Sequence, residues 1–161
     1  MPDTLVTATT MKSPTTGRYP ISKDVIDTRI TPYIEQASER LREWVGDAAY
    51  DDAVTTPAPD ISGLPAAEQR FIIRRRKVLA TVEGDLTMSY LIVNLNTVVT
   101  PQGVVTEARE EGQTVVRYLS PSQVREQAAV WFDQAQMMAA RYLANGDVPA
   151  AQVEFAEVVY G

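Results

Sequence analysis

The stretch "LSPSQVREQAAVWFDQAQMMAARYL", residues 119–143, decides the fold class, because it joins a helix start signal to a helical hydrophobic pattern. Ser120 is placed to cap the helix, Pro121 suits the first helical position, and Gln123 completes a Ser-x-x-Gln capping box. Apolar side chains then recur every three or four residues. They are Val124, Ala128, Trp131, Ala135, Met138 and Tyr142. The pattern predicts a long amphipathic helix with one buried face.

An earlier helix is predicted in "TPYIEQASERLREWVG", residues 31–46. Thr31 can act as its N-cap, Pro32 fits the first helical position, and Gly46 ends it. Its apolar positions share one stripe, as expected for a helix that packs on a core. They are Ile34, Ala37, Leu41, Trp44 and Val45.

A second long helix is predicted from about Leu64-Pro65 to residue 95, where apolar residues keep a helical period. A straight helix of that length would measure about 46 Å, longer than a domain of this size is wide. It therefore either projects from the body or bends, and Gly84 is the favoured position for a bend. Between the two helices, "DAAYDDAVTTPAPDISG" (47–63) shows no stripe and is predicted to be a long loop.

Residues 97–118 predict a β-hairpin that lies between the last two long helices. Glycine and proline favour turns in "TPQG", and Gly112 in "REEGQ" allows a chain reversal between two runs of strand-forming residues. The valines expected in these strands are Val99, Val104, Val105, Val115 and Val116. The fold class predicted is thus mainly α: a small bundle of three to four helices, a hairpin inserted before the last long helix, and extended arms at both ends.

The two ends differ from the middle of the chain. Residues 1–19 are rich in Thr, Ser and Pro without periodicity, and are interpreted as a flexible or extended arm. Residues 20–146 form the expected helical domain, and residues 147–161 an extended tail that is unusually apolar. Such a tail either folds back on its own core or adds to the surface of another protein. Its candidate contact residues are Val148, Val153, Phe155, Val158, Val159 and Tyr160.

Composition argues against most catalytic chemistry. The 161 residues include no cysteine and no histidine, so thiolate chemistry, the usual neutral-pH base and the commonest metal ligand are all missing. Ser120 and Ser122 have no conventional base and are interpreted as capping residues. The aspartates around Tyr50 do not match the spacing of a calcium loop. We therefore predict no catalytic, cofactor or metal site. No apolar run is long enough for a membrane span, and the N-terminal stretch is not of signal-peptide type.

Charge argues against a nucleic-acid-binding protein. The net charge is −6, whereas DNA-binding proteins gain most of their affinity by neutralising phosphates. The basic run Arg74, Arg75, Arg76 and Lys77 lies mid-helix, where consecutive side chains point to different sides. We expect it to serve a solvated surface or salt bridges between subunits, with Arg75, on the apolar stripe, paired to a carboxylate at an interface.

The order of the parts resembles the head–tail connector proteins (adaptors, or head-completion proteins) of tailed bacteriophages. The resemblance rests on "ITPYIEQASERLREWVGDAAY", a long helix, the turn in "LNTVVTPQGVV", and the capped helix quoted first. It covers about residues 22–145. It implies a small helical protein that forms a dodecameric ring beneath the portal, extends the DNA channel, and docks the next head-closure (stopper) or tail protein.

The same resemblance implies roles for the segments outside the helices. The hairpin would reach a neighbouring subunit or ring, the C-terminal tail would bind the portal ring, and DNA would pass without sequence-specific binding. The protein would be made in the host bacterial cytoplasm and reside in the neck of the virion. The alternatives are a helical regulatory module that binds a partner protein or DNA and, third, a small hydrolase built on carboxylates.

Overall fold

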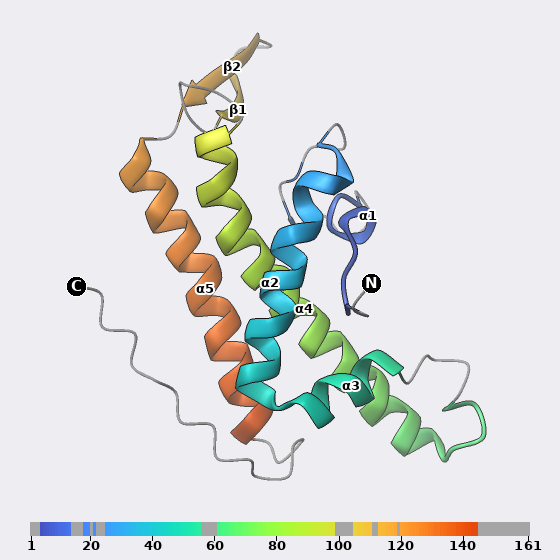
Figure 1. The fold of residues 1–161 in the computed structure, drawn as a ribbon. Coiled ribbons are helices and arrows are strands. Elements are labelled where there is room, and N and C mark those ends of the chain that lie inside the picture. Colours follow the sequence, from blue (N-terminus) through green and yellow to red (C-terminus); the bar gives the residue numbers. More distant parts are fainter. Residues whose placement is uncertain are drawn as a thin grey trace.

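The computed structural model describes residues 4–13, 18–19, 21, 25–55, 61–98, 105–110, 113–118 and 120–144. The chain is mainly helical, which confirms the predicted class (Figure 1). The helices are α1 (Ala8–Met11), α2 (Asp27–Val45), α3 (Asp47–Thr55), α4 (Ala66–Val98) and α5 (Pro121–Ala144), and the strands are β1 (Val105–Glu110) and β2 (Gln113–Tyr118).

Helix α4 is the centre of the bundle. Helix α5 packs along one side of it, α2 lies along another, and α3 crosses near its N-terminal half (Figure 1). From Val82 to Ser89 every residue of α4 is buried, including Glu83 and Asp85. A helix buried on all sides has no single apolar stripe, so its pattern is weaker than that of a surface helix.

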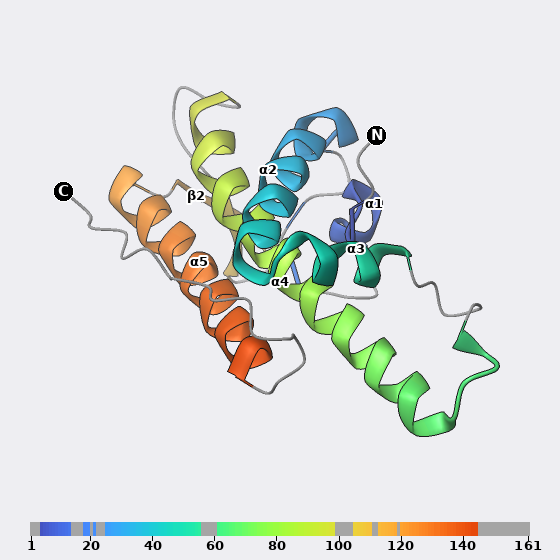
Figure 2. The same ribbon diagram turned by 60° about the horizontal axis from the view of Figure 1, so that its bottom comes forward.

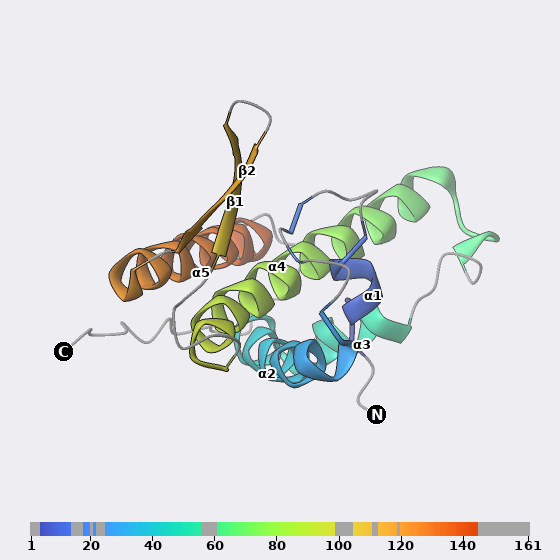
Figure 3. The ribbon, with the colours of Figure 1, turned by 90° about the horizontal axis from the view of Figure 1, so that it is seen from above.

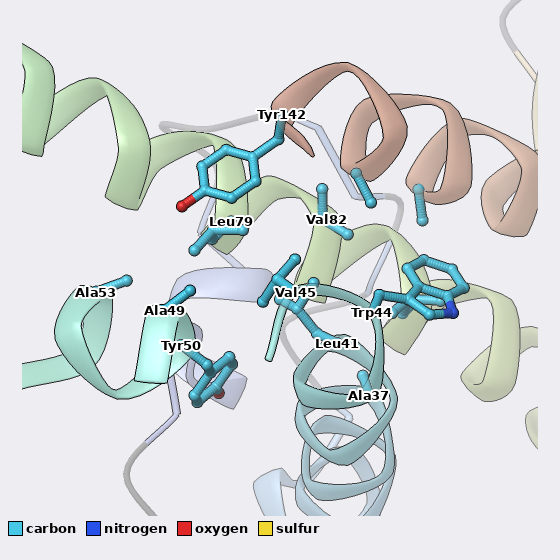
Figure 4. Close-up of a cluster of buried hydrophobic side chains, with 13 residues drawn as sticks. Ala37, Leu41, Trp44, Val45, Ala49, Tyr50, Ala53, Leu79, Val82 and Tyr142 are labelled. Atoms are coloured by element: carbon cyan, nitrogen blue, oxygen red, sulfur yellow. The ribbon is translucent and has the colours of Figure 1, made fainter. Parts of the chain in front are cut away.

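Two hydrophobic clusters hold these helices together. In the first, Leu41 and Val45 of α2 meet Leu79 and Val82 of α4, and Tyr142 of α5 closes the same cluster (Figure 4). The second joins the N-terminal segment to α2, α4 and the start of α5. Its buried members are Val6, Ala8, Met11, Ile30, Ile34, Met88, Leu91, Ile92 and Val124.

Helix α5 begins as the sequence predicts. The backbone N–H of Ser120 donates to the Gln123 side chain (2.9 Å), and the Gln123 N–H donates to Ser120 Oγ (3.3 Å). This is the reciprocal pair of a capping box, which satisfies two N–H groups that would otherwise lack partners. Four of the six predicted stripe residues are buried, whereas Trp131 and Met138 are only partly buried.

Helix α2 starts earlier than predicted. Asp27 is its first residue and Pro32 lies inside it, so Thr31 is not the N-cap; its hydroxyl donates instead to the Asp27 carbonyl (3.0 Å). The proline removes one backbone hydrogen bond. The additional turns bury Ile30 completely, which offsets that loss. Gly46 ends the helix as predicted, with a φ of 86° that favours glycine.

The predicted loop 47–63 is wrong for its first half, which forms helix α3. Ala49, Tyr50 and Ala53 are buried against the first cluster. Arg42 of α2 pairs with Asp51 (2.7 Å) and lies 4.2 Å from the centre of the Tyr50 ring. Contacts with α2 and α4, rather than a strong local pattern, stabilise this short helix.

The interpretation of residues 1–19 as a flexible or extended arm is wrong for the described residues 4–13. Thr7 and Thr10 form a reciprocal cap at the start of α1, and Val6 and Met11 are buried in the second cluster. A short apolar segment of low periodicity thus completes the core.

Helix α4 continues through Gly84 without interruption, and its axis changes direction along its length rather than running straight (Figure 1). A Cβ atom at Gly84 would lie 2.1 Å from the Tyr19 hydroxyl oxygen, so the glycine allows a close approach of that ring. The N-terminal end of α4 also extends beyond the end of α5, as the prediction of projection expects (Figure 2).

Strands β1 and β2 pair antiparallel, from Val105 opposite Tyr118 to Glu110 opposite Gln113. They stand away from the helical body between α4 and α5 (Figure 3). Thr97 and Val98 belong to α4, so the extended segment begins later than the predicted residue 97.

Candidate functional site

The most unusual feature of the core is Glu83, a completely buried carboxylate on α4. Its Oε1 accepts hydrogen bonds from the backbone N–H groups of Leu5 (3.0 Å) and Val6 (3.1 Å). Its Oε2 accepts a hydrogen bond from the Tyr50 hydroxyl. One side chain therefore ties the N-terminal segment and α3 to the central helix.

The surroundings of Glu83 shift two ionisation equilibria. Burial raises the pKa of Glu83 to about 7, although the hydrogen bonds from Tyr50, Val6 and Leu5 oppose the shift. Burial, reinforced by the nearby Glu83 charge, also raises the pKa of Tyr50. Near neutral pH, Glu83 thus exchanges between a protonated and an ionised form inside the core.

A second buried carboxylate, Asp85, holds the same N-terminal region by a different contact. Arg18 binds it through Nε (3.0 Å) and Nη2 (2.6 Å), a bidentate geometry. The hydrogen bond to Asp85 is the main cause that raises the pKa of Arg18. Between the two carboxylates, Gly84 leaves room for the Tyr19 ring, whose hydroxyl donates to the Thr81 carbonyl (3.3 Å).

Glu83, Gly84 and Asp85 together form a docking site for the chain's own N-terminal segment. The Glu83 carboxylate is enclosed by its three donors and fully buried, so it is placed to hold structure rather than to reach a substrate. Sequence reasoning missed this role. The available signal was "VEGDL", which places two acids inside an otherwise apolar helical stretch.

Several grooves lie on the outside of the described helices, and two of them lie between long helices. The larger of these two, of about 920 Å³, lies between α2, α4 and α5. Tyr90, Val93 and Phe132 supply apolar surface, and charged residues of both signs line its edges. These charged residues are Glu39, Arg40, Glu43, Arg125 and Glu126.

The smaller groove, of about 530 Å³, lies between α4 and the C-terminal end of α5. We call it the arginine groove, because Arg74, Arg75 and Arg141 line it together with four apolar or aromatic side chains. Those four are Phe71, Val78, Met138 and Tyr142.

The basic run predicted from the sequence contributes to this groove. Arg74 is exposed, whereas Arg75 is half-buried, pairs with Asp52 (3.2 Å) and donates a hydrogen bond to the Tyr142 hydroxyl. The carboxylate that pairs with Arg75 is thus Asp52 of the same chain. The prediction that Arg74, Arg75 and Arg76 pair across subunits is not tested in a single chain.

The other predicted contact residues fall on strands or outside the described residues. Val105 lies in β1, and Val115 and Val116 lie in β2. Val99, Val104 and all six tail residues lie outside the described part of the chain. The latter are Val148, Val153, Phe155, Val158, Val159 and Tyr160.

Within the described ranges, no group of three or more Asp or Glu side chains is placed to hold a metal ion. None of the helices described is both long and apolar enough to cross a bilayer. The chain matches no known family model, and no curated protein or solved structure is detectably similar to it.

Proposed function

We propose that this chain is a structural protein of the tailed-bacteriophage neck: an adaptor that forms a ring under the portal. In that role it extends the DNA channel and docks the next head-closure or tail component. The proposal starts from the resemblance of the helical segments and the turn between them to connector proteins.

The observation that carries it is the apolar surface left on the outer faces of the long helices. On α5, Val130 and Met137 are 54% and 48% exposed, and they lie seven residues apart, on the same side of the helix. On the projecting end of α4, Phe71 and Ile73 are 48% and 51% exposed. In a ring, neighbouring subunits would cover such surfaces.

In the same proposal, strands β1 and β2 contact a neighbouring subunit or ring. A two-stranded hairpin is marginally stable in water unless something packs on it. A neighbouring subunit or a second ring would supply that surface through Val105, Val115 and Val116. The C-terminal tail would add to the portal, a form of recognition by backbone pairing. The negative net charge of the chain would limit the binding of DNA to the wall of the channel.

Electron microscopy of the full chain mixed with the portal protein of the same phage tests the proposal. We expect rings of this protein on one face of the portal. A chain truncated at Asn145 should keep its helical circular dichroism and no longer join the portal. Particles that show bare portals with the full chain would contradict the proposed function, and normal binding of the truncated chain would contradict the role of the tail.

The alternative from another class is a helical regulatory module that binds DNA or a partner protein. An electrophoretic mobility-shift assay with duplex DNA separates it from the adaptor. Binding that weakens steeply as salt rises would favour the alternative. An adaptor is expected to leave the DNA unshifted.

A further inference from the structure

The arginine groove lies where the chain leaves its last helix. Tyr142 lines the groove, and α5 ends two residues later at Ala144. Beyond this point α4 continues without α5 beside it (Figure 2). The groove and the exposed Phe71 therefore lie next to the start of the C-terminal segment, residues 145–161.

The groove and that segment are complementary in charge. Arg74 and Arg141 are exposed and make no ion pair with any residue in the described part of the chain. The segment contains three acidic residues and no lysine or arginine. The acidic residues are Asp147, Glu154 and Glu157.

The two surfaces are also complementary in their apolar content. Phe71, Val78 and Met138 give the groove an apolar lining between its arginines. In the segment, Phe155 and Val158 stand beside the two glutamates. An acidic and apolar segment therefore complements a groove of this composition in both charge and apolar surface.

Geometry allows the segment to reach the groove in its own chain. Residues 147–160 span up to about 46 Å when extended. The part of α4 from Phe71 to Val78 is only about 10 Å long. Because the segment is tethered beside the groove, its effective concentration there is on the order of millimolar, which favours it over a second copy at low protein concentration.

We propose that, in the free protomer, residues 147–160 dock in the arginine groove of the same chain. Glu154 and Glu157 pair with Arg74 and Arg141, and Phe155 packs against Phe71. The inference does not rest on the proposed ring. If the adaptor proposal also holds, the portal has to displace the segment from this groove before binding it.

Paramagnetic relaxation in the full chain tests the inference. The protein has no cysteine, so Ala156→Cys provides a single attachment site for a nitroxide. With ¹⁵N-labelled protein we expect loss of the amide signals of residues 71–78 and 138–142, and their recovery when the nitroxide is reduced. Unchanged signals in these two stretches would overturn the inference.

A mixing experiment distinguishes docking within one chain from docking onto a second copy of the protein. Here ¹⁵N-labelled protein without a nitroxide is combined with unlabelled, spin-labelled protein. The inference expects no loss of signal in this mixture. Loss at residues 71–78 would assign the groove to the segment of a second copy and overturn docking within one chain.

Charge reversal checks the contacts. The double variant Arg74→Glu and Arg141→Glu should abolish the signal loss, and adding Glu154→Arg and Glu157→Arg should restore it. Arg125→Glu is the matched control, because it reverses an exposed arginine on α5 outside the arginine groove. Thermal unfolding of each variant verifies that the fold is intact. Signal loss that survives the double reversal would overturn the proposed contacts.

Discussion

Glu83→Gln is the substitution that most directly tests how the N-terminal segment is held. The amide keeps the size of the carboxyl group, and its oxygen can still accept from the N–H groups of Leu5 and Val6. Its NH₂ group would face the Tyr50 hydroxyl, which can rotate to accept a hydrogen bond. The packing should therefore survive, while the ionisable group is removed.

The expected magnitude follows from the pKa of Glu83, which rises from 4.5 to about 7 on folding. Between these values the folded protein holds the proton more tightly than the unfolded chain does. This group's contribution to the free energy of unfolding is therefore highest below pH 4.5, falls as the pH rises to 7, and is constant above. At about 1.4 kcal/mol per pKa unit, the fall amounts to about 3 kcal/mol.

The assay is urea unfolding, followed by the fluorescence of Trp44 and Trp131 between pH 4.5 and 8. We expect the stability of Glu83→Gln relative to the natural chain to increase by about 3 kcal/mol across this range. Glu126→Gln, an exposed residue on α5, is the matched control and should show no such trend. A difference that stays constant from pH 4.5 to 8 would refute the assignment of Glu83 as a buried, titrating group.

Three further substitutions probe other contacts. Arg18→Ala leaves Asp85 buried without the arginine that pairs with it, and should lower the free energy of unfolding by about 3 kcal/mol. Adding Asp85→Asn removes the buried charge and should recover part of this loss in the same urea assay. Gly84→Ala should displace the Tyr19 ring despite its better helix propensity, seen as faster hydrogen exchange of the N-terminal segment. Ser120→Ala removes the cap of α5 and should cost about 1 kcal/mol in thermal unfolding.

The sequence predicted the elements whose stability is encoded locally. Helix α5 has a capping box, a proline at its first position and a regular stripe, so its start at Pro121 could be predicted to the residue. The end of α2 was equally clear, because Gly46 adopts a positive φ that other residues avoid. Each of these signals lies within a few residues of the feature that it specifies.

The missed elements depend on contacts between distant residues. Helix α3 is short and weakly patterned, and it is held by Arg42 and by the hydrogen bond from Tyr50 to Glu83, 33 positions away. The N-terminal segment is held by the same Glu83. No local pattern in either segment reveals these partners, because helices of this length are unstable alone.

The candidate site was missed for a related reason. A carboxylate within a helical stretch is normally expected at the surface, since burying its charge is costly without partners. Here the partners are two backbone N–H groups and a tyrosine hydroxyl from other parts of the chain. The acidic residue is visible in the sequence, whereas the hydrogen-bond donors that compensate its burial are not. The arginine groove is similar, because Arg74 and Arg141 are brought together only when α4 packs against α5.

These contacts change which end of the chain is available to a partner. The N-terminal segment is bound through Glu83 and Asp85 and buries Val6 and Met11, so releasing it would expose both carboxylates and part of the second cluster. Residues 145–161 lie outside the described part of the chain. If the protein is an adaptor, partner recognition should therefore reside in the C-terminal segment and the exposed faces of α4 and α5. The N-terminal segment then acts as part of the fold that presents them.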